Sequence, residues 1–152
     1  MTHIRMTGEK DMKKDDMEKH LLFTVDARYI RHLLVALTSL SVNDAGIAYH
    51  IHIICNEPGE ENREKVMRLC AECGYGCTFY KVSKELFADA PVNKRYPKEM
   101  YYRMLAGSVL PEAVEKIVYL DPDILIINPL HPLWDIPMEG NLFLGATHLE
   151  YR

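Results

Sequence analysis

The chain has 152 residues, of which 48% are hydrophobic and 26% are charged, and its formal net charge is −4. Such a length and composition are typical of one globular domain with a buried core. The negative charge argues against nucleic acid as a partner. No stretch approaches the roughly 18 apolar residues of a transmembrane helix, and the N-terminus lacks the apolar core of a secretory signal. We therefore expect a cytoplasmic protein, which a partner could recruit to the inner face of the membrane.

The N-terminal half of the chain alternates between strand and helix patterns. Residues 1–19 are polar and Met-rich, which predicts a disordered tail. Short apolar runs predict strands at 20–25, 49–56 and 77–82, and helical spacing of apolar residues predicts helices at 28–42 and 60–73, with Gly74 ending the second. This order predicts parallel strands joined by right-handed crossovers.

The C-terminal half is less regular. A polar loop over 88–100 leads into a helix expected at 98–108, and strands are expected at 117–120, 124–128 and 141–147. Leu133 and Trp134 are expected in the core. Residues 20–152 are thus predicted to form an α/β domain, with a mostly parallel sheet flanked by helices in a Rossmann-type arrangement.

Cysteines and histidines offer weaker signals. Cys70, Cys73 and Cys77 are close enough in sequence to suggest zinc, but a closed site needs four ligands and Cys55 belongs to another segment. Thiols near a helix end are the favoured interpretation, and a cytoplasmic chain would keep them reduced. The pair His50 and His52 shares a strand face and is interpreted as structural.

The segment Asp121-Pro122-Asp123 carries the clearest chemical signal. An apolar strand runs directly into two acids, although Asp is depleted in strands and its charge is costly to bury. Residues i and i+2 of an extended chain point to the same side, so both carboxylates can face one point, and Pro122 stiffens the pair. Two hard oxygen ligands suit Mg²⁺ or Mn²⁺ shared with substrate phosphates, while an acidic turn is the plain alternative.

Two other residues are candidates for the same edge of the sheet. Asp26 ends the first strand, and in this topology the first and fourth strands can lie side by side. It could accept a hydrogen bond from a base or ribose, cap the following helix, or do both. Arg103 precedes the fourth strand and could pair with an aspartate or a diphosphate, or simply be exposed.

Three segments, TVDARY, YYRML and VYLDPDILIINPLHPLWDI, together resemble glycosyltransferase family 8, which includes lipopolysaccharide galactosyl- and glucosyltransferases. The resemblance runs from about His20 to Ala146. It implies a GT-A fold and a retaining enzyme that transfers a hexose from a UDP-sugar to a saccharide acceptor. It also implies that Asp121 and Asp123 hold Mn²⁺ (or Mg²⁺) against the diphosphate, that Thr24, Asp26 and Tyr29 line the uracil pocket, and that Arg103 lies near the donor sugar. No residue is assigned a catalytic role.

Two departures qualify the resemblance. Arg28 stands where the family usually has Asn two positions after the first-strand acid. Family members also carry a second half of comparable size, which supplies a late metal-binding histidine and much of the acceptor site. We therefore expect a truncated domain that binds UDP and metal weakly and transfers sugar poorly or not at all.

Two alternatives come from other functional classes. Haloacid-dehalogenase-like phosphatases also place Asp-x-Asp after an apolar strand, but they normally continue with a small residue or Gly-Thr, where this chain has Ile124-Leu125. The chain could instead be a non-catalytic nucleotide-binding or interaction module. An unpaired sheet edge favours self-association, so a homodimer is a further expectation.

Overall fold

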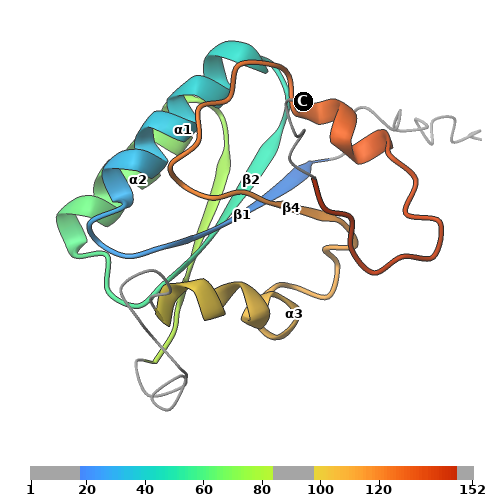
Figure 1. The fold of residues 1–152 in the computed structure, drawn as a ribbon. Coiled ribbons are helices and arrows are strands. Elements are labelled where there is room, and N and C mark those ends of the chain that lie inside the picture. The colour runs from blue at the N-terminus through green and yellow to red at the C-terminus, as the bar shows by residue number, and fades with distance from the viewer. Residues whose placement is uncertain (1–17, 84–97, 147–152) are drawn as a thin grey trace, which may run out of the picture.

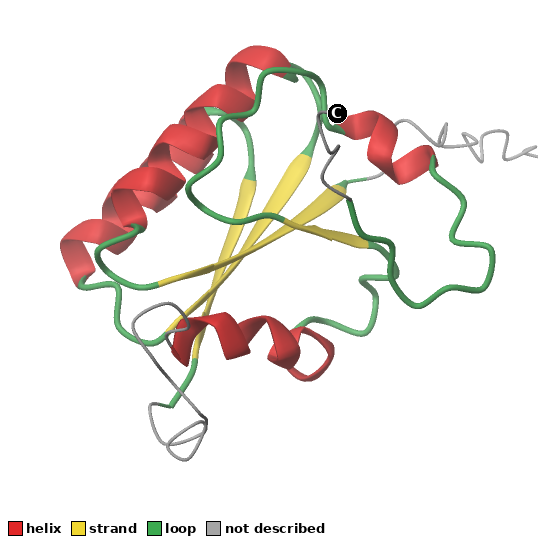
Figure 2. Cartoon of the chain, viewed as in Figure 1, coloured by secondary structure: helices red, strands yellow, loops and turns green. Residues whose placement is uncertain are grey.

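The computed structural model describes residues 18–83 and 98–146. Four strands form one parallel sheet in the order β3-β2-β1-β4: β1 (Lys19–Val25), β2 (Tyr49–Cys55), β3 (Gly76–Lys81) and β4 (Ile117–Tyr119). The helices are α1 (Ile30–Asn43), α2 (Glu60–Glu72) and the short α3 (Ala106–Val109), with 3-10 helices η2 (Lys98–Leu105) and η3 (His131–Asp135). The predicted α/β class, the parallel sheet and the pairing of the first and fourth strands are confirmed (Figures 1 and 2).

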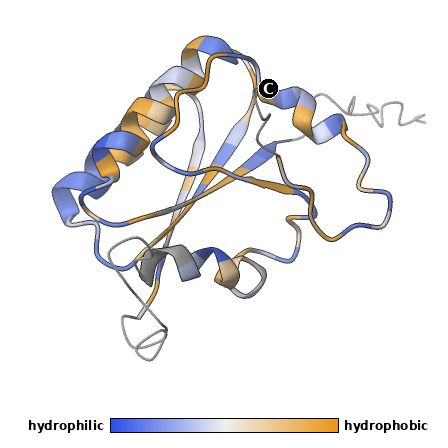
Figure 3. Cartoon of the chain, viewed as in Figure 1, coloured by the Kyte–Doolittle hydropathy of each residue, from blue (hydrophilic) through white to orange (hydrophobic). Residues whose placement is uncertain are grey.

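The larger core lies between the sheet and the α1–α2 pair (Figure 1). Apolar β-strand positions alternate between the two faces of the sheet, so Leu21, Phe23 and Val25 face the helices together. The buried stripe of α1 meets them, and the mixed hydrophobic and hydrophilic colouring of that helix in Figure 3 reflects its two faces. Gly74 has a φ of 74°, the left-handed conformation that ends α2 as expected.

A smaller core lies on the opposite face of the sheet. Leu22, Ile54, Val82 and Tyr102 are its buried members, and the partly buried side chains of α3 pack against them. The helix pattern expected at 98–108 is therefore present, but as η2 followed by the short α3. This segment brings Arg103 close to the end of β4, where its Nη2 lies 3.8 Å from Asp121 Oδ1.

Polar side chains occupy the other end of this second face. His20 Nδ1 lies 3.0 Å from His52 Nε2, and His52 Nδ1 lies 2.9 Å from the Tyr80 hydroxyl. His50 stacks on His52 with ring centroids 4.5 Å apart, in agreement with a structural role for both. A Cβ on Gly76 would lie 2.5 Å from His50 Nδ1, so the absence of a side chain there leaves room for the ring.

The short strand expected at 124–128 does not form. The backbone N–H of Ile126 donates to Ser39 Oγ at 2.9 Å, and its carbonyl accepts from Asn43 Nδ2 at 3.0 Å. Both partners are side chains of α1, so they replace the neighbouring strand that a β-ladder would need. The apolar run packs across α1, with Ile126 buried in the larger core.

The prediction of a strand at 141–147 is also wrong for residues 141–146, which are the part of this range that the structure describes. Residues 142–146 form no strand, and Leu142 and Phe143 are 96% and 84% exposed. A strand requires a hydrogen-bonding neighbour, and none of the described strands runs alongside this segment. Of the core residues expected nearby, Trp134 packs against the larger core but Leu133 is exposed.

Two predicted segments fall largely outside the described residues. These are the tail at 1–19, of which Lys19 begins β1, and most of the loop at 88–100. Between residues 18–83 and 98–146, no helix has the length and apolarity needed to cross a membrane.

Candidate nucleotide and metal site

The candidate site lies where β1 and β4 end side by side. Leu22 of β1 is paired with Tyr119 of β4, and the backbone N–H of Leu120 donates to the Leu22 carbonyl at 3.0 Å. Because the strands are parallel, the segments after them leave the same edge of the sheet. Asp26 and Asp121 are therefore placed at the carboxyl edge, where open α/β sheets bind their ligands.

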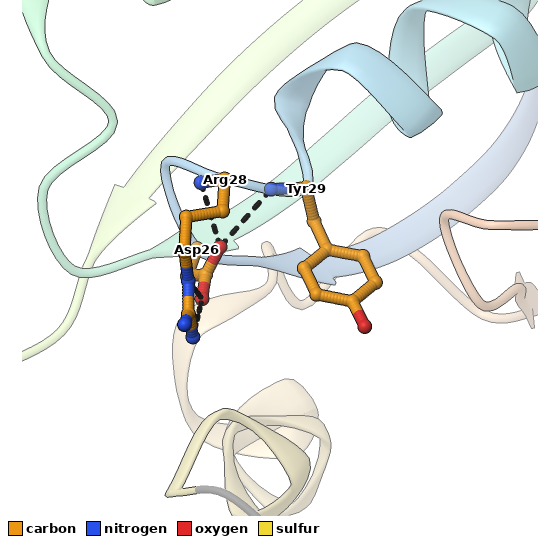
Figure 4. Close-up of polar contacts among 3 residues, drawn as sticks. All are labelled: Asp26, Arg28 and Tyr29. Carbon is orange, nitrogen blue, oxygen red and sulfur yellow. Dashed lines mark hydrogen bonds and ion pairs between the residues drawn. The ribbon is translucent and has the colours of Figure 1, made fainter.

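Asp26 is held by the turn that leads into α1 (Figure 4). Its Oδ1 accepts from the backbone N–H groups of Arg28 and Tyr29 at 2.7 and 3.0 Å, and its Oδ2 accepts from Arg28 Nη2 at 2.6 Å. Burial alone would raise the pKa of Asp26, but these hydrogen bonds outweigh it and keep the pKa below its usual value. Asp26 therefore caps the turn that precedes α1, whereas the N-cap of the helix itself is Tyr29, which makes no side-chain cap hydrogen bond, so the predicted helix-capping role is wrong in that detail.

Tyr29 is part of the same turn but directs its ring away from the Asp26 carboxylate (Figure 4). The ring is 41% exposed and lies 5.1 Å from the His32 ring, centroid to centroid. It is thus accessible to a planar group at the end of β1.

The two aspartates after β4 are both exposed, and Pro122 between them is buried. This arrangement anchors the turn through the proline and leaves the carboxylates facing solvent. Asp121 Oδ1 accepts a hydrogen bond of 2.8 Å from the Tyr119 hydroxyl, and Arg103 Nη2 lies 3.8 Å from the same oxygen. The structure therefore brings Arg103 to Asp121.

Tyr119 connects the predicted residues to one another, although the sequence did not single it out. Its hydroxyl lies 3.1 Å from Thr24 Oγ1, and the Arg103 guanidinium carbon lies 4.7 Å from its ring centroid. Thr24, Arg103 and Asp121 therefore meet around one phenol. Strand periodicity could have indicated this, because Tyr119 lies two residues before Asp121 and so points to the same side.

A cavity of about 550 Å³ opens beside this edge of the sheet. It lies over the ends of β2 and β3, and it is lined by Ala27, Asn56, Gly59, Arg63 and Lys81, among others. Ala27 joins the cavity to the Asp26 turn. None of the residues predicted for the site lines the cavity, because sequence patterns mark strand ends but not the space between two loops.

The donor set suits a hard divalent cation shared with a ligand. In residues 18–83 and 98–146 no group of three His, Cys, Asp or Glu side chains is arranged to hold a metal ion, and this includes the cysteines near the end of α2. Mg²⁺ and Mn²⁺ sites of nucleotide enzymes often use one or two carboxylates and take their remaining ligands from phosphates and water. Asp121 and Asp123 supply two carboxylates around this turn, and their binding of a metal ion stays a prediction.

The sequence model of the protein family described as glycosyl transferase family 8 matches residues 20–150 of this chain. The chain belongs to this family. The GT-A fold implied by the resemblance is confirmed by solved structures. The chain aligns with galactosyltransferase LgtC in complex with donor and acceptor sugar analogues at a TM-score of 0.71 and 29% identity, over 78% of this chain and 43% of that one. Mouse xyloside xylosyltransferase 1 shares the fold, with a TM-score of 0.57 and 20% identity over 78% of this chain and 47% of that one.

Curated relatives come from bacteria and plants. Lipopolysaccharide 1,2-glucosyltransferase of Escherichia coli K12 is 22% identical over 80% of this chain and 36% of its own length. General stress protein A of Bacillus subtilis is 24% identical over 82% of this chain and 44% of its own length. Probable galacturonosyltransferase-like 4 of Arabidopsis thaliana is 25% identical over 93% of this chain and 41% of its own length. The chain thus spans less than half the length of these relatives. Family membership favours a transferase over a phosphatase.

Proposed function

We propose that this chain is the donor-binding part of a retaining hexosyltransferase, which takes a hexose from a UDP-sugar and transfers it to a saccharide acceptor. The observation that carries the proposal is the convergence of Thr24, Arg103 and Asp121 on Tyr119, where β1 and β4 end. Family membership supports the reaction class, and the name of the lipopolysaccharide 1,2-glucosyltransferase relative supports a saccharide acceptor.

Each of the proposed binding residues would contact a different part of the donor. Asp121 and Asp123 would hold Mn²⁺ (or Mg²⁺), and the bound ion would stabilise the charge that develops on the diphosphate leaving group. Arg103 contributes a guanidinium beside Asp121, where it can meet diphosphate oxygens. The nucleoside would lie near Thr24, Asp26 and the exposed ring of Tyr29, with the cavity beside Ala27 offering adjacent space.

Arg28 stands where the resemblance implies Asn, and it affects the proposed nucleoside end of the site. Its guanidinium already bonds Asp26 Oδ2, so a ribose hydroxyl would have to compete with it or bind Arg28 itself. We therefore expect the chain to bind the donor weakly. Weak binding is also expected because only two protein ligands would hold the metal ion. A cytoplasmic location at the membrane face and homodimer formation remain predictions from the sequence.

Calorimetric titration of UDP in the presence of Mn²⁺ tests the proposal. Wild-type chain should bind UDP, and Asp121→Asn should weaken binding by about 10-fold or more, because it removes a charged ligand. Asp135→Asn is the matched control, since Asp135 is an exposed aspartate at the end of η3. Rapid hydrolysis of a simple phosphomonoester that Asp121→Asn abolishes would instead establish the phosphatase alternative and refute the transferase.

A further inference from the structure

Two hydrogen bonds connect Thr24 of β1, through the Tyr119 hydroxyl, to Asp121, the first of the two proposed metal ligands. These two bonds form a hydroxyl relay. Tyr119 has one hydroxyl proton, and it donates that proton to Asp121 Oδ1 at 2.8 Å. The 3.1 Å contact between Thr24 Oγ1 and the Tyr119 hydroxyl must then have Thr24 as the donor. The direction of both bonds is therefore fixed: Thr24 donates to Tyr119, and Tyr119 donates to Asp121.

The surroundings hold the Tyr119 ring in place. Its hydroxyl is hydrogen-bonded to both Asp121 and Thr24. The Arg103 guanidinium covers the ring from the other side, 4.7 Å from its centroid. The ring also packs in the smaller core, so it has a firm support within an otherwise exposed site.

The relay engages one oxygen of Asp121. Oδ1 accepts from Tyr119 and faces Arg103, whereas Oδ2 accepts no hydrogen bond from the part of the chain that the structure describes. A metal ligand whose other oxygen is fixed by a hydrogen bond is held in a defined orientation, and such outer contacts raise metal affinity.

We propose that Tyr119, supported by Thr24, is the positioning residue of the donor site: it fixes Asp121 through Oδ1 and presents Oδ2 to the divalent cation. This inference rests on the proposed function, because it takes Asp121 as a metal ligand. It adds a role for a residue that would act on the cation through Asp121. It also links the strand that carries the nucleoside residues to the metal site.

Titration of Mn²⁺ without nucleotide, followed by the electron paramagnetic resonance signal of the free ion, tests the inference. Tyr119→Phe should weaken Mn²⁺ binding by about 10- to 100-fold, the range seen when an outer hydrogen bond to a metal ligand is lost. Thr24→Val should weaken it in the same direction, and Thr24→Ser should restore it. Omitting UDP removes any direct effect of Thr24 on the nucleoside.

Tyr80→Phe is the matched control, because it removes a phenol hydroxyl from the same sheet face, where it bonds His52 rather than an aspartate. Thermal unfolding of each variant separates stability from metal affinity. If Tyr119→Phe lowers the unfolding temperature as Tyr80→Phe does but binds Mn²⁺ as the wild type does, its role is structural and the inference is wrong.

Asp123→Ala distinguishes this failure from that of the proposed function. If Asp123→Ala abolishes Mn²⁺ binding and Tyr119→Phe leaves it unchanged, the metal site stands and only the positioning role is refuted. If Asp123→Ala binds Mn²⁺ as tightly as the wild type, Asp-Pro-Asp is not the metal site, and the positioning role is refuted with it.

Discussion

Acidification should destabilise the fold through the histidines on the sheet. His52 is 1% exposed, and burial, followed by the charges of His50 and His20, lowers its pKa from 6.5 to about 4. Burial also lowers the pKa of His20. Below pH 6.5 the unfolded chain binds a proton at His52 that the folded chain does not bind until about pH 4. Stability is therefore complete above pH 6.5 and falls as the pH falls through this window.

The size of the effect follows from the shift of the His52 pKa from 6.5 to about 4. At about 1.4 kcal/mol for each pKa unit, the free energy of unfolding should fall by roughly 3 kcal/mol across the window. That is a large part of the roughly 5–15 kcal/mol available to a small domain. The carboxyl groups of Asp26 and Asp44 have lowered pKa values, so their contributions are lost only below about pH 3.8, outside this window.

Urea denaturation followed by circular dichroism at pH 7.5 and pH 4 measures this loss. His52→Gln removes the titrating group but keeps an amide that can bond Tyr80. It should therefore abolish most of the fall in the free energy of unfolding between pH 7.5 and pH 4. His32→Gln, at an exposed position on α1, is the control and should retain it. An equal fall in wild type and His52→Gln would refute the assignment to His52.

Two further substitutions test the packing of the fold. Asp44 is 4% exposed and accepts hydrogen bonds from the backbone N–H and Nδ1 of His131, so Asp44→Ala should lower the free energy of unfolding by about 3 kcal/mol in urea denaturation. A change below 1 kcal/mol would show that this contact is dispensable. Gly76→Ala should destabilise by about 1–3 kcal/mol because its Cβ would meet His50, whereas Gly107→Ala, with nothing within 4 Å, should not. Equal thermal unfolding temperatures for these two variants would contradict the steric argument.

The parallel sheet could be predicted because its information is local. The strands β1 and β2 are short apolar runs followed by Asp26 and Asn56, and α1 has one buried apolar stripe. Asp26 and Asp121 could be placed at one edge because parallel strands put their carboxyl ends together. These inferences need only the period of the pattern and the order of the elements.

The C-terminal segments could not be predicted in the same way. Ile126 lies in a run that reads as a strand, but its backbone is bonded by Ser39 and Asn43, whose side chains are 87 and 83 residues away in sequence. Leu142 and Phe143 also lie in an apolar run, yet none of the described strands lies beside them. A strand pattern indicates that a segment can form a strand. Only the tertiary arrangement decides whether a neighbouring strand is present to pair with it.

Some features of the site could also be predicted from the local sequence, and others could not. The exposed Asp-Pro-Asp turn follows from the strand before it and the proline within it. The pairing of Asp26 with Arg28 depends on the conformation of the turn, and the link from Thr24 to Tyr119 depends on the register between two strands 95 residues apart in sequence. Register is set by packing across the whole sheet, so local periodicity could place Tyr119 on the side of Asp121 but could not show that Thr24 lies beside it.

The dependence of UDP binding on a divalent cation tests the central claim most directly. Calorimetric titrations of UDP into the wild-type chain and into Asp123→Ala, each with Mn²⁺ and with a chelator, compare four affinities. We expect Mn²⁺ to tighten UDP binding to the wild type by about 10-fold or more, and to have no effect on Asp123→Ala. Equal UDP affinity with and without Mn²⁺, or an undiminished effect of Mn²⁺ in Asp123→Ala, would contradict the assignment of Asp121-Pro122-Asp123 as the metal and diphosphate site.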